Sequence, residues 1–148
     1  MNITNKAVLI TGANRGIGRA LVNEALRRGA KRVYAGARSA FQHADKRVTP
    51  LTLDVTSASQ IQRAAAEVDS LDVLINNAGI YLYDDLGNSD IIEQHLAVNL
   101  FGSLKVTRAF LPLLRRSKGA IVNNLSLRRS PPCRLPPLIP FRRLPHST

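Results

Sequence analysis

Cysteine is almost absent from this chain: Cys133 is the only one in 148 residues, so no intrachain disulfide can form. A chain without disulfides suits the reducing cytosol, and no signal peptide precedes the first strand-like segment, so we expect a cytoplasmic protein. No apolar run reaches the roughly 18 residues that a transmembrane helix needs, so no membrane span is expected. The length allows one domain with a substantial core.

Acidic residues are scarce as well: 10 Asp and Glu stand against 21 Lys and Arg, which gives a net charge of +11. An excess of this kind is typical of nucleic-acid binding. Its distribution argues against that function. The last 22 residues hold five arginines and no acid, and the remaining +6 is scattered over the first 126 residues. Because no basic stripe is interleaved with aromatic residues, we expect solvated surface charge and no nucleic-acid partner.

Apolar segments alternate with amphipathic ones along the first 126 residues. The expected strands are 6–11, 32–36, 48–53, 71–75 and 119–125, and the expected helices are 16–28, 57–68 and 89–116. Near-continuous apolar strands are typical of a parallel sheet that is buried on both faces. The alternation therefore predicts an α/β fold, a doubly wound parallel sheet with short right-handed crossovers.

The ends of the expected helices carry local signals. Ser57 and Asp90 each stand three residues before a Gln or Glu, which is the pattern of a capping box. Gly29 follows the first helix and suits a C-terminal cap. Pro112 lies near the end of the long helix and is expected to kink it or end it early.

The composition changes abruptly at Leu127. Six of the chain's eight prolines lie in residues 127–148, together with the five arginines. We expect a folded domain over 1–126 and a disordered or extended tail over 127–148. The segment Arg134–Pro140 fits the R-x-x-P-x-x-P pattern of polyproline ligands, although a segment this rich in Pro and Arg produces such matches by chance.

The stretch Thr11–Gly18 reads T-G-A-N-R-G-I-G and lies between an expected strand and an expected helix. Strand, glycine-rich turn and helix in this order form a cradle for the phosphates of a dinucleotide. Gly12 permits the tight turn, Gly16 lets the backbone approach the pyrophosphate, and Gly18 lets the helix pack closely on the strand. Taken alone, the stretch is also compatible with a loop that merely turns.

Four further motifs follow the glycine turn. Asp54–Val55 closes the third strand, Asn76–Gly79 follows the fourth, Asn99 lies on the long helix, and Ser126 ends the fifth strand. In this order and spacing the five motifs resemble the short-chain dehydrogenases/reductases over residues 1–126. The resemblance implies a Rossmann-type sheet, truncated here after the fifth strand, with a dinucleotide across the open ends of the first and fourth strands.

The resemblance also implies a set of cofactor-binding residues: Gly12, Asn14, Arg15, Gly16, Ile17, Gly18, Arg38, Asp54, Val55, Asn77, Ala78 and Gly79. In similar proteins Asp54 would contact the adenine side and Val55 would lie beside the ring. The acid that binds the ribose 2′-hydroxyl of NAD is missing after the second strand, where Arg38 stands, and Arg15 faces the same pocket in similar proteins. The expected cofactor is therefore NADP, and NAD is less favoured. Asp54 can also serve as a helix N-terminal charge, Asn77 as a turn residue, and the two arginines as plain surface side chains.

The resemblance implies a catalytic Asn, Ser, Tyr and Lys, of which the chain matches two. Asn99 matches the asparagine that holds a water of the proton relay, and Ser126 the serine that binds the substrate oxygen. Ile139 and Arg143 stand where the tyrosine and lysine should follow, and no tyrosine follows Tyr83. Ser126 is also compatible with a plain strand end. No metal site is expected.

These features predict an NADP-dependent short-chain oxidoreductase that is truncated and catalytically impaired. Its parent reaction would be hydride transfer between nicotinamide and a carbonyl or secondary alcohol of a small molecule. The alternatives are a non-catalytic NADP-binding protein and an interaction protein that uses its Pro/Arg-rich tail. We also expect an apolar helix face over 89–116 that supports a homo-oligomer. The change at Leu127 suggests a shift of the reading frame shortly after Ser126.

Overall fold

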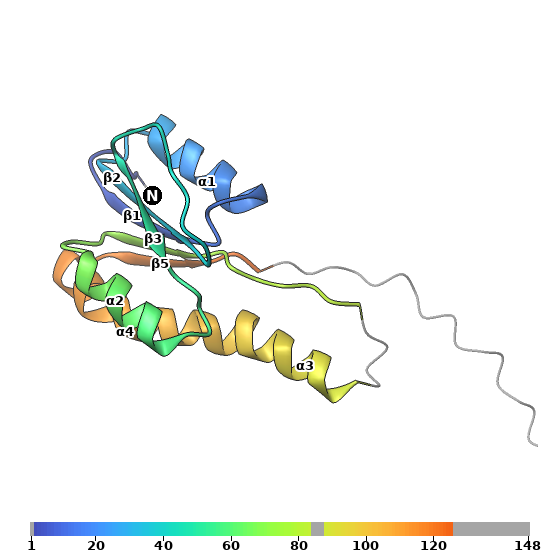
Figure 1. Ribbon diagram of the computed structural model, residues 1–148. Helices are drawn as coiled ribbons and strands as arrows, with labels where there is room; N and C mark the ends of the chain where they lie inside the picture. Colours follow the sequence, from blue (N-terminus) through green and yellow to red (C-terminus); the bar gives the residue numbers. More distant parts are fainter. Residues whose placement is uncertain (1, 84–87, 126–148) are drawn as a thin grey trace, which may run out of the picture.

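The structure, a computed structural model, describes residues 2–83 and 88–125, which form a parallel sheet covered by helices on both faces (Figure 1). The strands are β1 Ala7–Thr11, β2 Arg32–Ala37, β3 Val48–Thr52, β4 Val73–Asn76 and β5 Ala120–Asn123. The helices are α1 Gly16–Arg27, α2 Ala58–Glu67, α3 Ser89–His95, the π-helical segment η1 Leu96–Gly102, and α4 Ser103–Ser117. Ser126 and the tail at 127–148 lie outside the described residues, so the domain boundary at 126 stays a prediction.

The strands lie in the order β3-β2-β1-β4-β5, and every neighbouring pair is parallel. The predicted doubly wound α/β sheet is confirmed. The chain lays down β1, β2 and β3 outward in one direction and then returns to place β4 on the other side of β1. The strand order therefore reverses between β1 and β4, and the carboxyl ends of strands at such a reversal are where open α/β sheets bind their ligands.

Alternate strand residues point into two separate apolar cores. On one face, Ile10 of β1 packs with Val22 of α1. On the other face, Leu9 packs with Phe110 of α4. All four side chains are buried, since successive residues of a central strand face opposite sides of the sheet. Figure 1 shows the resulting layers, with α1 on one face and α2 and α4 on the other.

The predicted long helix is observed as the uninterrupted run of α3, η1 and α4. The expected early end at Pro112 was wrong, because Pro112 lies inside α4, which continues to Ser117; the alternative, a kink at Pro112, stays a prediction. Pro112 is exposed, whereas Phe110 and Leu114 are buried in the core, so packing holds the last turns although the proline donates no hydrogen bond. The hydrogen-bonding pattern of the long helix changes from α-helical to π-helical in η1, which precedes α4. No helix in the described residues is long and apolar enough to cross a membrane.

The capping predictions had mixed outcomes. Ser57 caps α2 as predicted, and its Oγ accepts a hydrogen bond from the Gln60 N–H at 3.4 Å. The Gln60 side chain reaches back to the Asp54 N–H at 2.8 Å, so the motif is a variant of the capping box. The cap predicted at Asp90 was wrong. Asn88 caps α3 by accepting from the Asp90 N–H at 3.0 Å, which places the Asp90 charge inside the first turn.

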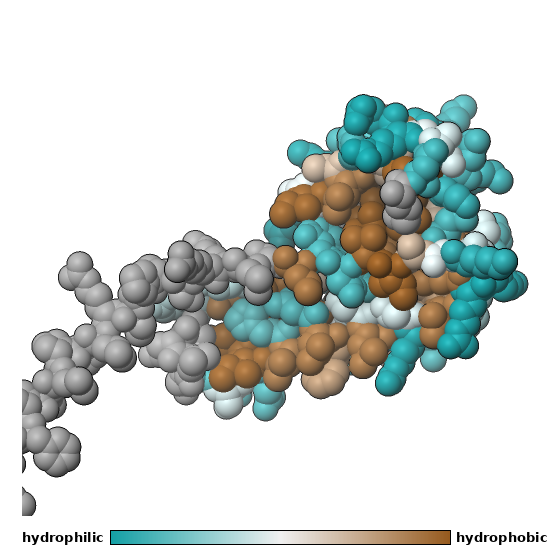
Figure 2. Space-filling model, turned by 180° about the vertical axis from the view of Figure 1, so that it is seen from behind, coloured by the Kyte–Doolittle hydropathy of each residue, from teal (hydrophilic) through white to brown (hydrophobic). Residues whose placement is uncertain are grey.

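β5 is one of the two edge strands of the described sheet and is shorter than predicted. Ile121 and Val122 of β5 are 41% and 40% exposed, unlike the buried residues of β1 and β2. A second exposed apolar surface runs along the long helix, where Ile92, Leu96, Leu100 and Leu104 recur every four residues; we call these residues the helix stripe. Figure 2 shows apolar side chains gathered along this helix, low in the view. Neither surface is covered by another described segment.

Candidate functional site

The glycine turn lies at the carboxyl end of β1, beside the reversal of strand order. Gly12 and Gly16 have φ values of +68° and +52°, which L side chains rarely adopt. A Cβ on Gly16 would meet no atom within 4 Å, so the backbone there faces open space. A Cβ on Gly18 would overlap the carbonyl oxygen of Gly12, so α1 can pack at this distance only with glycine at position 18. The geometry agrees with the tight turn expected at Gly12 and the close helix packing expected at Gly18, while the pyrophosphate contact expected at Gly16 stays a prediction.

Among the described residues, the N-cap residue Arg15 gives the start of α1 no side-chain cap. The first turn holds no acidic residue. Asn14, Arg15 and Ile17 are exposed, with Ile17 exposed by 65%. The helix therefore presents uncapped N–H groups and the positive end of its dipole to the space above the turn.

Thr11 joins the glycine turn to the segment after β4. Its Oγ1 accepts hydrogen bonds from the N–H groups of Asn77 and Ala78, both at 2.9 Å. The Asn77 side chain also binds the glycine turn. Its Nδ2 donates to the carbonyl oxygen of Thr11 at 2.9 Å and lies 3.4 Å from the carbonyl oxygen of Gly12. The structure thus brings together two motifs that stand 65 residues apart. The role of Thr11 was missed at the sequence level, although a hydroxyl residue at the end of β1 was the available signal.

Two asparagine side chains at the carboxyl end of β4 form hydrogen bonds with two asparagine side chains at the carboxyl end of β5. Asn76 lies within β4, one residue later than the predicted strand end, and Nδ2 donates to Asn123 Oδ1 at 2.9 Å and to Thr107 Oγ1 at 3.0 Å. Asn124 Nδ2 donates to Asn77 Oδ1 at 2.9 Å. The buried Oδ1 of Asn76 has no hydrogen-bond partner among the described residues. These bonds fasten the carboxyl ends of β4 and β5 to each other and to the early turns of α4.

Arg38 directly follows β2, and the glycine turn is hydrogen-bonded to the end of that strand. The Ala13 N–H donates to the carbonyl oxygen of Gly36 at 2.9 Å. Arg38 and Arg15 are both exposed. Two guanidinium groups, those of Arg15 and Arg38, therefore lie on the two segments that border the turn. The nearest acid along the chain after β2 is Asp45, which forms an ion pair of 2.7 Å with Arg47.

Asp54 and Val55 follow β3 at the same edge of the sheet. Asp54 Oδ1 accepts from the N–H and the Oγ1 of Thr56 at 2.8 and 2.7 Å, so its carboxylate is held in a local turn. Val55 is 6% exposed and belongs to the core, where a Cβ on Gly102 would stand 2.7 Å from its Cγ2. The predicted contacts of Asp54 and Val55 with an adenine ring stay predictions.

The side chain of Asn99 binds the backbone of Ile80, the residue that follows the Asn77–Gly79 motif. Its Oδ1 accepts from the Ile80 N–H, and its Nδ2 donates to the Ile80 carbonyl oxygen, both at 2.9 Å. One turn earlier on the same helix, His95 Nε2 accepts from the Leu82 N–H at 2.9 Å, a contact that the sequence did not indicate. Asn99 is therefore at the site, next to Gly79, whereas Ser126 lies outside the described residues.

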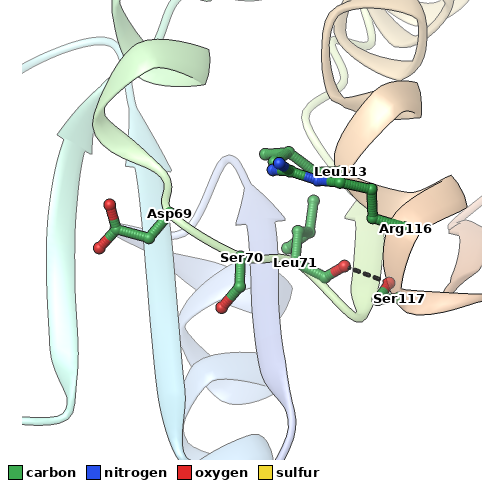
Figure 3. A pocket seen from close by; sticks show the side chains of 6 residues that line it. All are labelled: Asp69, Ser70, Leu71, Leu113, Arg116 and Ser117. Carbon is green, nitrogen blue, oxygen red and sulfur yellow. Dashed lines mark hydrogen bonds between the residues drawn. The ribbon is translucent and has the colours of Figure 1, made fainter.

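A separate depression lies at the amino edge of the sheet, opposite the glycine turn. It has a volume of about 280 Å³ and lies between the segment before β4 and the end of α4 (Figure 3). Ser117 Oγ closes it by donating to the Leu71 carbonyl oxygen at 2.6 Å. Among the described residues that line it, Asp69 and Arg116 carry charge. Nowhere in residues 2–83 and 88–125 do three or more His, Cys, Asp or Glu side chains gather as a metal site would require.

The parallel sheet, the reversal between β1 and β4 and the glycine turn at the start of α1 define an open α/β domain of Rossmann type. The family model for short chain dehydrogenases matches residues 6–131. The chain belongs to the short-chain dehydrogenase family, and the resemblance seen in the sequence is confirmed.

The relatives are longer than this chain. Mouse estradiol 17-beta-dehydrogenase 2 is 37% identical over 142 residues, a match that covers 84% of this chain and 37% of the mouse protein. Bovine retinol dehydrogenase 12 is 38% identical over 141 residues, covering 85% of this chain and 44% of the bovine protein. Among solved structures, a short chain dehydrogenase from Burkholderia cenocepacia J2315 in complex with NADP is 37% identical with a TM-score of 0.79. That match covers 83% of this chain and 54% of the bacterial one. The chain thus spans about half or less of the length of these three relatives.

Proposed function

We propose that this chain binds a nicotinamide dinucleotide at the carboxyl ends of β1 and β4. The observation that carries the proposal is the glycine cradle: a Cβ on Gly16 would enter open space, and the uncapped start of α1 faces it. Backbone N–H groups at a helix N-terminus are suited to a pyrophosphate. The family and the NADP complex of the Burkholderia relative support the same ligand.

The remaining residues of the motifs would surround the dinucleotide. In this proposal Gly12, Asn14, Gly16, Ile17 and Gly18 hold the pyrophosphate side, Arg15 joins Arg38 at the 2′-phosphate, Asp54 and Val55 hold the adenine side, and Asn77, Ala78 and Gly79 line the cofactor. The exposure of Ile17 supports a ligand contact at this residue, because covering its apolar side chain with a ligand would remove apolar surface from water, which is favourable. When bound, the nicotinamide supplies a hydride donor or acceptor.

We infer a preference for NADP over NAD. Arg38 and Arg15 offer two guanidinium groups on the segments that border the turn, and their forked donors fit a 2′-phosphate. An acid that would bind a ribose 2′-hydroxyl is missing between Arg38 and Asp45.

Fluorescence titration of NADPH and NADH into the purified chain tests the preference. Tighter binding of NADPH is expected, and Arg38→Asp is expected to weaken it about 10- to 150-fold, since a charge-assisted hydrogen bond contributes about 1.5–3 kcal/mol. Arg63→Asp, an equal change of charge on the exposed face of α2, serves as the matched control. Equal affinities for the two cofactors, or tighter NADH, would contradict the assignment.

The proposed reaction of the parent family is hydride transfer to or from a carbonyl or secondary alcohol of a small molecule. In this chain Asn99 would contribute to the proton relay and Ser126 to orienting the substrate oxygen. Because the chain contains no Tyr-x-x-x-Lys, we propose that proton transfer is impaired by about 10²–10⁴-fold. NADPH oxidation measured with a panel of carbonyl compounds checks this. Ordinary turnover would contradict it, and binding without turnover would support the alternative of a non-catalytic cofactor-binding protein.

We also propose that the helix stripe pairs with a second copy of the chain. Four exposed apolar residues in one row support an association surface. Light scattering of the wild type and of Leu100→Lys measures the association state, with a monomeric variant as the expected result.

We propose the cytoplasm as the compartment of this protein, because its lone Cys133 allows no intrachain disulfide; cell fractionation tests this proposal.

A further inference from the structure

Asn124 makes two hydrogen bonds to the segment that carries the proposed cofactor residues. Its backbone N–H donates to the carbonyl oxygen of Asn76 at 2.9 Å, which extends the pairing of β4 and β5 by one residue. Its side-chain Nδ2 donates to Oδ1 of Asn77 at 2.9 Å. The side chain of Asn124 therefore reaches across from the end of β5 to the Asn77–Gly79 motif.

The carboxamide of Asn77 is fixed by its surroundings. Its Nδ2 faces the carbonyl oxygens of Thr11 at 2.9 Å and of Gly12 at 3.4 Å. A Cβ on Gly18 would stand 2.8 Å from the same nitrogen, so the amide also lies close against the start of α1. A flipped amide would place its oxygen against two carbonyl oxygens, so only one orientation satisfies the donors and acceptors. In that orientation Oδ1 needs a donor, and Asn124 supplies it.

We propose that Asn124 is a positioning residue for the dinucleotide site: it locks the Asn77 carboxamide and so holds the end of β5, the Asn77–Gly79 motif and the glycine turn in one hydrogen-bonded chain. The inference rests on the proposed dinucleotide binding and adds a residue outside the glycine turn and the Asn77–Gly79 motif. The bond requires a side-chain donor at position 124, because Asn77 Oδ1 can only accept. Aspartate has the same shape without the donor, leucine a similar size without polar atoms, and glutamine keeps the donor on a longer arm.

NADPH titration of four variants tests the role, with the melting temperature of each variant measured alongside. Asn124→Asp and Asn124→Leu are expected to weaken binding about fivefold, as the loss of one hydrogen bond implies. Asn124→Gln is expected to stay within about twofold of the wild type. Asn23→Asp, at an exposed position of α1, introduces the same charge as Asn124→Asp and is expected to bind like the wild type.

Nuclear magnetic resonance of the Asn77 side-chain amide supplies a readout that a general loss of stability would not move. Its two Nδ2 proton signals are expected to shift in Asn124→Asp and Asn124→Leu and to keep their positions in Asn23→Asp. Unchanged signals and unchanged affinity in both Asn124 variants would overturn the inference. So would a loss of affinity that follows the melting temperature alone and is the same for glutamine. A wild-type chain that binds neither NADPH nor NADH rejects the proposed function itself, a failure seen before any substitution is made.

Discussion

Replacing Gly18 by alanine tests the packing on which the glycine turn depends. A Cβ at this position would overlap the Gly12 carbonyl oxygen and would lie 2.7 Å from the Gly12 carbonyl carbon. Carbon atoms pack best at about 3.5–4.0 Å, so α1 and the turn must separate by about 0.8 Å or more. The atoms in the way belong to the backbone, and the Asn77 amide on the far side is itself hydrogen-bonded. The clash therefore cannot be relieved by rotating one flexible side chain.

The expected cost follows from two opposing effects. Overpacking of this kind costs about 1–3 kcal/mol and occasionally more. Alanine gains about 1 kcal/mol over glycine inside a helix. Because the overlap is with backbone, we expect the upper end of the steric cost to prevail. Gly18→Ala should then lower the free energy of unfolding by about 2–3 kcal/mol, which is a drop of roughly 4–12 °C in melting temperature for a chain of this size.

Urea unfolding followed by circular dichroism measures the loss. Gly16→Ala is the matched control, because a Cβ there meets nothing within 4 Å and only the φ of +52° is unfavourable. The control is expected to lose about 1–2 kcal/mol through its backbone conformation. A Gly18→Ala variant that is as stable as the wild type would refute the argument, since alanine's helix preference would then be the larger effect.

Two further predictions concern the core and the amino edge of the sheet. Phe110→Ala should cost about 3–5 kcal/mol, because this fully buried ring fills the core between α4 and the sheet; a loss below about 1 kcal/mol in urea unfolding would contradict that packing. Asp72 accepts from the Ala7 N–H at 2.8 Å and pairs with Lys6 at 3.0 Å. Burial raises the pKa of Asp72, but these two bonds lower it more, so the pKa lies below its ordinary value. The bonds therefore stabilise the fold above the ordinary carboxyl pKa of about 4 and stop doing so as the pH falls through the lower folded value. Asp72→Ala should cost about 2 kcal/mol at pH 7 and progressively less in acid, whereas a difference independent of pH would speak against this role.

Features that depend on neighbouring residues could be predicted from the sequence. Gly29 ends α1 as expected, with its N–H bonded to the Leu26 carbonyl oxygen and the next N–H to that of Ala25. Ser57 caps α2 for the same reason, since the bond closes within three residues. The parallel sheet followed from the alternation of apolar and amphipathic segments, because parallel strands need helical crossovers.

Features that depend on distant contacts could not be predicted. Pro112 persists inside α4 because buried residues on the opposite side of the helix stabilise it, and packing of this kind leaves no local pattern. The bond from Leu82 to His95 and the bond from Asn124 to Asn77 join segments 13 and 47 residues apart. An asparagine or histidine in such a place looks the same in the sequence whether or not a partner reaches it.

The hydroxyl of Thr11 has a consequence for the thermodynamics of ligand binding. One oxygen accepts two successive N–H groups from the segment after β4, so that segment and the glycine turn cannot move independently without breaking both bonds. The unusual backbone angles of Gly12 and Gly16 are likewise already adopted in the folded chain. A dinucleotide entering this site would meet a preorganised surface, and little of its binding free energy would be lost to ordering loops. Its association should accordingly be close to a lock-and-key event, with a small change in the hydrogen exchange of the turn.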